Sequence, residues 1–251
     1  MTAPALRWAG VAKRFDGVVA LDGVSLDVPA GQFVALVGPS GSGKSTLLRT
    51  ANRLVEPESG RIELDGADVA VEPAPLLRRR IGYVFQEIGL FPHLSVAENI
   101  VLPARVAGRS APDVAELLAL VDLPAEVAPR RPDALSGGQR QRVGVARALS
   151  TGARLMLMDE PFGALDPVTR DALATAVRAL HDRLGLTTVM VTHDMAEALL
   201  LADRVVVLAK GRIVADAAPA TLLAGEAGAE AAALVAVPRA QAERLAAMAR
   251  A

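Results

Sequence analysis

The chain has 251 residues, which is room for one large domain with a subdomain and for a substantial buried core. It contains no cysteine, so a disulfide scaffold, a thiolate metal site and a cysteine nucleophile are excluded. Hydrophobic residues make up 52% of the chain and the formal net charge is -1, which exclude a disordered protein and the basic excess typical of nucleic-acid binders. We therefore expect no nucleic-acid partner.

No segment approaches the roughly 18 apolar residues that cross a bilayer. The first ten residues also lack the basic and apolar regions of a signal peptide, so we expect the chain to stay in the cytoplasm. The longest apolar runs, residues 155–158, 187–191 and 204–209, have the length of strands. Their apolarity fits a parallel sheet buried on both faces.

The first ninety residues have the pattern of short strands and turns. A Pro/Gly turn in residues 26–31 ends one strand, and another strand begins at residue 32 and runs to 37. Residues 61–66 alternate between polar and apolar and end in Asp-Gly, which predicts a hairpin. From about residue 94 to 149 the pattern is helical, with a capping box at residues 95–98 and a helix in 113–121.

Beyond residue 150, strand and helix patterns alternate along the chain. Strands are predicted at 155–158, 187–191 and 205–208, and helices at 168–183 and 195–201. This rhythm is typical of βαβ units, so we expect parallel strands with right-handed crossovers. From about residue 217 the chain is rich in alanine and has mostly helical propensity.

Residues 38–45 read Gly-Pro-Ser-Gly-Ser-Gly-Lys-Ser and match the phosphate-binding P-loop pattern in full. An apolar strand precedes the motif and a helix-forming run follows it, which is the context that a P-loop requires. Backbone N–H groups of such a loop surround phosphates, Lys44 reaches the β and γ phosphates, and the Ser45 hydroxyl binds Mg²⁺. The predicted nucleotide-binding residues here are Gly38, Pro39, Ser40, Gly41, Ser42, Gly43, Lys44, Ser45 and Thr46.

Two acidic residues, Asp159 and Glu160, directly follow the apolar strand at 155–158. Asp159 suits Mg²⁺, and Glu160 suits polarisation of an attacking water. Taken alone, the pair is better interpreted as an ordinary strand end with solvated carboxylates. The P-loop elsewhere in the chain favours the catalytic interpretation.

A third motif is the segment Leu135-Ser-Gly-Gly-Gln139. With the P-loop and the acidic pair, it makes the chain resemble the nucleotide-binding subunit of an ATP-binding cassette (ABC) transporter over residues 6–223. The resemblance implies that Phe15 stacks on adenine and that Gln86 occupies the Q-loop. It also identifies Ala164-Leu165-Asp166 as the D-loop and His193 as the switch histidine.

The resemblance implies an α/β fold: a P-loop NTPase (RecA-like) core with an N-terminal antiparallel β subdomain and an inserted α-helical subdomain. We expect one ABC ATPase domain over 1–251. Residues 1–87 and 151–225 form the core with its β subdomain, 88–150 form the helical subdomain with the signature, and 226–251 form a short helical tail.

The resemblance also implies ATP and Mg²⁺ as cofactors and a head-to-tail homodimer. In such a dimer Ser136, Gly137, Gly138, Gln139 and Asp166 of one subunit close on ATP held by the other. Glu160, His193 and Gln86 are then the catalytic residues, while Ser45, Gln86 and Asp159 hold Mg²⁺. We expect no metal beyond the Mg²⁺ carried with the nucleotide.

A single cassette without a fused membrane domain, and without a heptad run between Lys44 and Asp159, points to an importer subunit. Residues 86–100 resemble those of glycine betaine, choline and related quaternary amine osmoprotectant importers, and 52–60, 77–83 and 159–167 fit the same subfamily. Apolar residues around 88–94 suit a groove for a helix of the membrane subunit. Only about 25 residues follow the cassette, so the regulatory repeats of many osmoprotectant ATPases are not expected.

The implied partners are integral membrane permease subunits and, indirectly, an extracytoplasmic solute-binding protein. The implied location is the cytoplasmic face of the inner membrane. Other cargoes (an amino acid or a sulfonate), an export role and a non-transport nucleotide-gated scaffold or regulator remain alternatives.

Several other residues attract attention without the same context. We interpret His93 and His181 as structural or solvent-facing, Arg78, Arg79 and Arg80 as a solvated face, and Met156 and Met158 as core.

Overall fold

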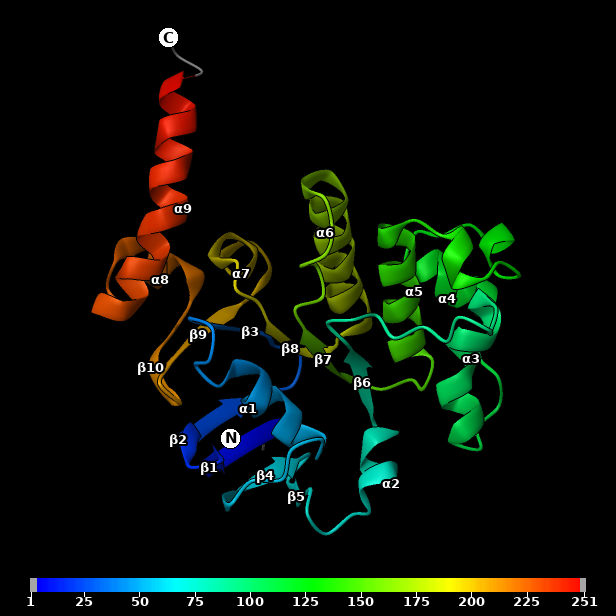
Figure 1. The fold of residues 1–251 in the computed structure, drawn as a ribbon, viewed down its shortest axis with the longest axis horizontal. Coiled ribbons are helices and arrows are strands. Elements are labelled where there is room, and N and C mark those ends of the chain that lie inside the picture. Colours follow the sequence, from blue (N-terminus) through cyan, green and yellow to red (C-terminus); the bar gives the residue numbers. More distant parts are fainter. Residues whose placement is uncertain (1–3, 249–251) are drawn as a thin grey trace.

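The computed structural model describes residues 4–248, and its strands form two sheets (Figure 1). The antiparallel sheet has the order β2-β1-β4-β5 and the larger sheet the order β10-β9-β3-β8-β7-β6. The strands are β1 (Leu6–Phe15), β2 (Val18–Val28), β3 (Phe33–Val37), β4 (Ser59–Leu64), β5 (Ala67–Asp68), β6 (Ile81–Val84), β7 (Leu155–Asp159), β8 (Thr187–Val191), β9 (Arg204–Ala209) and β10 (Arg212–Ala217). In the larger sheet β3, β6, β7, β8 and β9 are parallel, and β10 adds an antiparallel edge.

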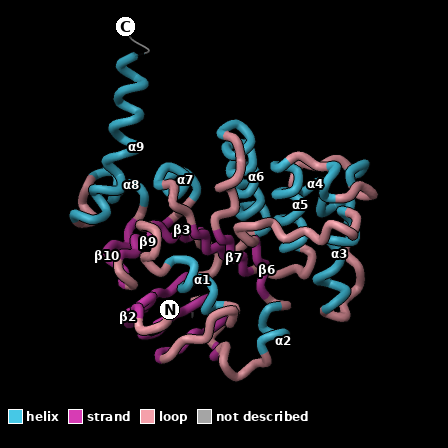
Figure 2. Tube along the Cα trace, viewed as in Figure 1, coloured by secondary structure: helices cyan, strands magenta, loops and turns pink. Residues whose placement is uncertain are grey.

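The helices surround the larger sheet and extend from it. They are α1 (Lys44–Ala51), α2 (Ala74–Arg78), α3 (Val96–Val106), α4 (Val114–Leu120), α5 (Gly137–Leu149), α6 (Pro167–Leu184), α7 (Met195–Leu201), α8 (Pro219–Ala224) and α9 (Ala229–Met248), with short 3₁₀ turns η1 (Ala125–Val127) and η2 (Pro132–Ala134). Figure 2 shows α3, α4 and α5 grouped at one end of the molecule and α9 projecting at the other. None of the helices within residues 4–248 is long and apolar enough to cross a membrane.

The larger sheet is buried on both faces, as its apolar strands predict. Every residue of β3 and β7 is buried, and neighbouring residues point to opposite sides because side chains alternate along a strand. Met156 and Met158 pack in the hydrophobic cluster shared with α5, α6 and α7. Leu155 and Leu157 pack in a second cluster with α1 and the antiparallel sheet. The two clusters hold α1 against one face and the longer helices against the other.

The predicted fold is confirmed: a P-loop α/β core, an N-terminal antiparallel sheet and the helical group α3–α5 lying between β6 and β7 in the chain. The hairpin turn at Asp65 and Gly66 is present with φ of 52° and 80°, and the capping box at Ser95 forms. The expectation of short strands near the N-terminus is wrong for β1 and β2, which have 10 and 11 residues. Away from the exposed turn that joins them, both strands contribute buried residues to the second cluster. Strand β10 was not predicted.

The proposed subdomain boundaries stay a prediction, and residues 249–251 of the predicted tail lie outside the described residues. Met156 and Met158 are buried as expected. His181 is fully structural rather than solvent-facing: its Nδ1 lies 2.9 Å from Thr188 Oγ1, and its ring packs on Phe33. His93 is exposed.

Candidate active site

The P-loop follows β3 and bends tightly between two neighbouring segments. A Cβ atom on Gly38 would lie 2.1 Å from the carbonyl oxygen of Leu208, and one on Gly43 would lie 2.3 Å from that of Ala20. Both glycines also have positive φ, 143° and 101°. The motif therefore needs glycine at these positions to fit between β2 and β9 and to lead into α1.

Two polar side chains of the loop, those of Ser42 and Lys44, are buried. Lys44 Nζ donates to the loop's own carbonyl oxygens at Gly38 and Pro39, each 2.9 Å away. Burial lowers the pKa of the Lys44 ammonium, and the carboxylates of Glu160 and Asp159 oppose that shift. The buried Ser42 hydroxyl has no hydrogen-bond partner within residues 4–248. These groups, with the N–H groups that begin α1, can receive a phosphate.

Asp159 at the end of β7 is buried and lies in a cluster of donors. Ser45 Oγ donates to its Oδ1 at 2.8 Å. Its other oxygen, Oδ2, lies 2.9 Å from Arg49 Nη2 and accepts a 3.3 Å hydrogen bond from Tyr83. Burial raises the pKa of Tyr83 to about 12, with a further contribution from the charge of Asp159, so its hydroxyl remains a donor. The predicted pair Ser45 and Asp159 is thus adjacent.

Glu160 lies beside both of the other predicted catalytic residues. Its Oε2 accepts a 3.3 Å hydrogen bond from Gln86 Nε2 and lies 3.2 Å from His193 Nδ1. Within the described part of the chain, Oε1 has no hydrogen-bond partner. The backbone of Glu160 has φ of 46°, and its N–H donates to Val191 O on β8. This contact fixes the turn that carries the carboxylate.

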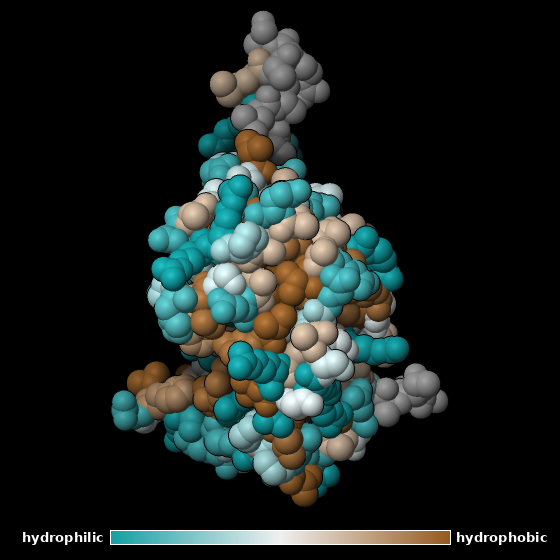
Figure 3. Space-filling view, turned by 90° about the vertical axis from the view of Figure 1, so that its right-hand side faces the viewer, coloured by the Kyte–Doolittle hydropathy of each residue, from teal (hydrophilic) through white to brown (hydrophobic). Residues whose placement is uncertain are grey.

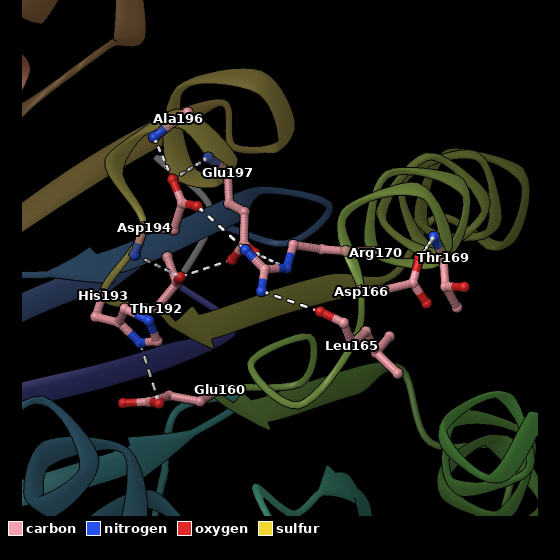
Figure 4. Close-up of polar contacts among 10 residues, drawn as sticks. All are labelled: Glu160, Leu165, Asp166, Thr169, Arg170, Thr192, His193, Asp194, Ala196 and Glu197. Atoms are coloured by element: carbon pink, nitrogen blue, oxygen red, sulfur yellow. Dashed lines mark hydrogen bonds and ion pairs between the residues drawn. The ribbon is translucent and has the colours of Figure 1, made fainter. Parts of the chain in front are cut away.

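The chain that follows Glu160 leads through Gly163 into the D-loop, whose Leu165 and Asp166 are drawn in Figure 4. A Cβ atom on Gly163 would lie 3.8 Å from Glu160 Oε2 and 3.9 Å from His193 Cε1. Asp166 caps α6, since its Oδ1 accepts from Thr169 N at 3.0 Å. Hydrogen bonds from Thr169 lower the pKa of the Asp166 carboxyl, which is exposed and stays ionised. The D-loop is therefore held by its own helix cap next to the candidate catalytic residues.

The remaining predicted parts of the site are the adenine-stacking residue and the signature segment. Phe15 is 46% exposed at the end of the β1–β2 hairpin, with Lys13 Nζ 5.2 Å from its ring centre. Ser136 begins α5 in a capping box with Gln139, followed by Gly137 and Gly138. In Figure 1, β6 and β7 lie between α5 and α1. The signature helix α5 and the P-loop helix α1 are therefore separated by strands of the sheet within one chain.

A family model described as ABC transporter matches residues 21–163. The chain belongs to the ABC transporter family. The cassette is 47% identical over 211 residues to the glycine betaine/carnitine/choline transport ATP-binding protein OpuCA of Bacillus subtilis, covering 82% of this chain and 56% of that protein. It is 48% identical over 211 residues to the sulfate/thiosulfate import ATP-binding protein CysA of Mycobacterium bovis, covering 82% and 59%. The cassette thus spans little more than half the length of these relatives.

Among solved structures, the cassette resembles the ATP-binding cassette MJ0796, described as a dimer in a post-hydrolysis state bound to ADP and Pi. The TM-score is 0.76 at 32% identity, and the match covers 85% of this chain and 98% of that chain. The fold of the cassette therefore agrees with that of a nucleotide-bound ABC protein.

Three further residues of the cassette were missed by sequence reasoning. Arg49 lies one helical turn after Ser45, which is the signal that both face Asp159. Arg147 is buried on α5 and donates to the carbonyl oxygens of Ile88 and Gly89 at 2.6 and 2.7 Å. Burial lowers the pKa of its guanidinium. Arg147 therefore fixes the segment that follows Gln86.

The third missed residue is Asn99, which is fully buried on α3. Its Oδ1 accepts from Phe91 N at 2.8 Å, and its Nδ2 donates to the carbonyl oxygens of Phe91, Leu94 and Ser95. Asn99 thus shapes the loop between Gln86 and the helical group.

Proposed function

We propose that this cassette is the ATP-hydrolysing subunit of an ABC importer. The observation that carries the proposal is the contact of Gln86 and His193 with one carboxylate oxygen of Glu160. Glu160 is also close enough to Lys44 of the P-loop to influence its charge state. A carboxylate held in this way, beside a phosphate-binding loop, suits activation of a water for attack on a terminal phosphate.

The donor set around Asp159 fits Mg²⁺ as well as ATP. The Ser45 hydroxyl, the Asp159 carboxylate and the Gln86 amide oxygen are the hard oxygen ligands that Mg²⁺ prefers. Bound Mg²⁺ would neutralise charge on the phosphates. Lys44 then exchanges its loop carbonyl partners for phosphate oxygens, and the exposed ring of Phe15 is available to stack on adenine.

Hydrolysis depends on the placement of the Glu160 carboxylate. The contacts with Gln86 and His193 both fall on Oε2, which leaves Oε1 to accept a hydrogen bond from the attacking water and align it with the terminal phosphate. His193 holds Glu160 in that orientation and lies where it can also approach the phosphate. The three side chains are thus proposed to act as one unit.

The site is completed by a second copy of the chain. In our proposal Ser136, Gly137, Gly138 and Gln139 at the start of α5 bind the phosphates held by the partner's P-loop, because a helix N-terminus favours anions. Asp166 lies at the same interface. The description of MJ0796 as a dimer bound to ADP and Pi supports this arrangement.

The permease subunits are proposed to bind beside the helical group. A groove of about 650 Å³ lies between α2, α3 and the segment after β6, and its lining includes Leu54, Phe85, Phe91, Leu102 and Val106. Figure 3 faces the end of the molecule where α3 and α4 lie and shows apolar side chains exposed among polar ones. An apolar groove next to Gln86 suits a short helix of a membrane subunit, which would hold the cassette at the cytoplasmic face of the inner membrane.

For the cargo we propose glycine betaine or a related quaternary amine, delivered by an extracytoplasmic solute-binding protein. The resemblance to OpuCA supports it, while the comparable identity to CysA makes sulfate or thiosulfate the second candidate. The cassette does not contact the cargo in this scheme, so its own site cannot select the solute.

The test is uptake of labelled glycine betaine by cells that lack their own copy of this subunit. Uptake should return with the intact chain and with Glu126→Gln, which changes an exposed carboxylate, but not with Glu160→Gln. Unlabelled choline or carnitine should compete, whereas sulfate should not. If the intact chain restores uptake of sulfate but not of glycine betaine, the proposed cargo is wrong and the proposed ATPase role still holds.

A further inference from the structure

Arg170 on α6 connects the D-loop to the segment that carries His193 (Figure 4). Its Nη2 donates to the carbonyl oxygen of Leu165 at 3.2 Å. Its Nη1 lies 3.7 Å from Asp194 Oδ2, and its Nε lies 3.7 Å from Glu197 Oε1. One guanidinium therefore contacts the loop after β7 and the start of α7 after β8.

Hydrogen bonds connect Glu197 to the residues on both sides of His193, so a displacement of Glu197 would move His193 as well. Glu197 Oε2 accepts from Thr192 Oγ1 at 2.7 Å, and the same hydroxyl accepts from Asp194 N at 3.0 Å. Asp194 Oδ1 in turn accepts from the N–H groups of Ala196 and Glu197. Residues 192–197 thus form one hydrogen-bonded unit with His193 inside it.

The Arg170 contact in the D-loop also lies near the candidate catalytic residues. Leu165 O, which Arg170 binds, lies two residues after Gly163, and Gly163 packs beside both Glu160 and His193. Arg170 therefore contacts both the segment that contains His193 and the segment that follows Glu160.

The contact is incomplete in the single chain. The Nε atom of Arg170 is buried and has no hydrogen-bond partner within residues 4–248, because Glu197 Oε1 lies beyond hydrogen-bond distance. A buried donor without an acceptor is costly, so a small approach of α7 to α6 would be favoured by completing this bond. The two segments thus have a closer arrangement available to them.

We propose that Arg170 is a positioning residue that couples the D-loop to His193. Contact of a partner subunit with the exposed Asp166 shifts the D-loop, Arg170 carries the shift to Glu197, and His193 moves relative to Glu160. This inference rests on the catalytic roles proposed above for Glu160 and His193. It assigns to this side chain the alignment of those residues when the dimer closes.

Arg178, two turns further along α6, provides a matched control. It is 30% exposed against 31% for Arg170. It likewise joins α6 to a neighbouring segment, through Leu201 O and Asp203, and it pairs with Asp182 on its own helix. Its hydrogen bonds and ion pairs within the described residues include neither the D-loop nor residues 192–197. Arg178→Met therefore removes a comparable set of contacts without touching the proposed coupling.

The experiment measures kcat, the Kd for ATP and the melting temperature for the purified full chain and for Arg170→Met, Arg178→Met and Glu160→Gln. Arg170→Met should lose about 10- to 100-fold in kcat, the scale of a misplaced catalytic group, with the Kd changed by less than about twofold. Arg178→Met should lower the melting temperature at least as much and keep kcat. Glu197→Gln combined with Arg170→Met should lower kcat by less than the product of the two single losses, because the two side chains share one contact while Glu197 also accepts from Thr192.

Unchanged kcat in Arg170→Met, or equal losses of kcat in the two arginine variants, would overturn the inference while Glu160→Gln remains inactive. Turnover retained by Glu160→Gln would instead overturn the catalytic role proposed for Glu160, and the coupling with it. The two failures are therefore separate results.

Discussion

Glu160 Oε2 lies 3.2 Å from His193 Nδ1, although the two residues are 33 positions apart in the chain. The contact follows from strand order. Glu160 directly follows β7, His193 comes two residues after β8, and Gln86 comes two residues after β6. Since β8, β7 and β6 are parallel neighbours, their carboxyl ends meet at one edge, and β3 brings the P-loop to the same edge.

Glu160→Gln should abolish ATP turnover and preserve ATP binding. The amide keeps the size of the side chain and loses the basic oxygen that orients water, so kcat should fall at least about 100-fold. ATP should then hold the variant as a closed dimer, detected by gel filtration or light scattering with and without nucleotide. Glu126→Gln is the control and should retain turnover. A Glu160→Gln chain that stays monomeric in ATP at high protein concentration would contradict the closed-dimer mechanism.

The sequence was sufficient to predict residues whose position is set by the end of a strand. The P-loop, Asp159 and Glu160 directly follow apolar strands, and a parallel sheet brings such ends together. Gln86 and His193 were expected from the family resemblance, and they follow β6 and β8 at the same edge. Local chemistry also predicted the capping box at residues 95–98 and the Asp-Gly turn, since both depend on neighbours within a few positions.

Contacts between distant helices were not predictable in the same way. Arg147 binds the backbone at Ile88 and Gly89, 59 and 58 positions earlier, and nothing in its own helix marks that partner. Arg170 likewise lies on an amphipathic helix whose charges resemble a solvated face. Which arginine is buried against a loop depends on how α5 and α6 pack, and this is determined by tertiary structure.

Without ligand, Arg49→Met should be less stable than the unmodified chain. Mg²⁺ and ATP should stabilise this variant more than they stabilise the unmodified chain. The change removes the cation beside the buried Asp159 carboxylate, but Arg49 is itself 44% exposed, so the cost should be only about 1 to 2 kcal/mol. Bound Mg²⁺ would supply the missing positive charge, so the rise in melting temperature on adding Mg²⁺ and ATP should exceed that of the unmodified chain.

The control for this change is Arg61→Met, which removes surface ion pairs with Glu63 and Asp68. Exposed pairs contribute about 0 to 1 kcal/mol, so this variant should unfold almost like the unmodified chain in urea. Equal destabilisation by the two substitutions would show that Arg49 is an ordinary surface arginine.

Gly138→Ala should destabilise the start of α5 through a steric clash. A Cβ atom there would lie 2.3 Å from Thr169 Cγ2, and overpacking of this kind costs about 1 to 3 kcal/mol. At Gly137 the nearest atoms lie 3.9 Å away, so Gly137→Ala should be tolerated. Urea unfolding of both variants measures the difference.

Thr169→Ser provides the rescue, because it removes the clashing methyl group and keeps the backbone N–H that donates to Asp166 Oδ1. The double variant Gly138→Ala, Thr169→Ser should recover most of the lost stability. If it remains as unstable as Gly138→Ala alone, the clash with Thr169 is not the cause.

His181 should make the stability of the fold fall in mild acid. Burial lowers its pKa from the ordinary value of 6.5, with the charge of Arg178 adding to the effect, so the folded chain favours the neutral ring. The unfolded chain takes up the proton first as the pH falls. The stabilisation is therefore complete above about pH 6.5 and is lost as the pH falls through the lower folded-state pKa.

Melting temperatures between pH 5 and 8 test this for the unmodified chain, His181→Asn and His93→Asn. His181→Asn keeps an acceptor near Thr188 Oγ1 and loses ring packing on Phe33, so it should melt lower at pH 8 and show a weaker decline in acid. His93 is exposed, so its substitution should leave the slope unchanged. Asparagine has no titratable ring. If the melting temperature of His181→Asn falls in acid as steeply as that of the unmodified chain, other groups cause the pH dependence.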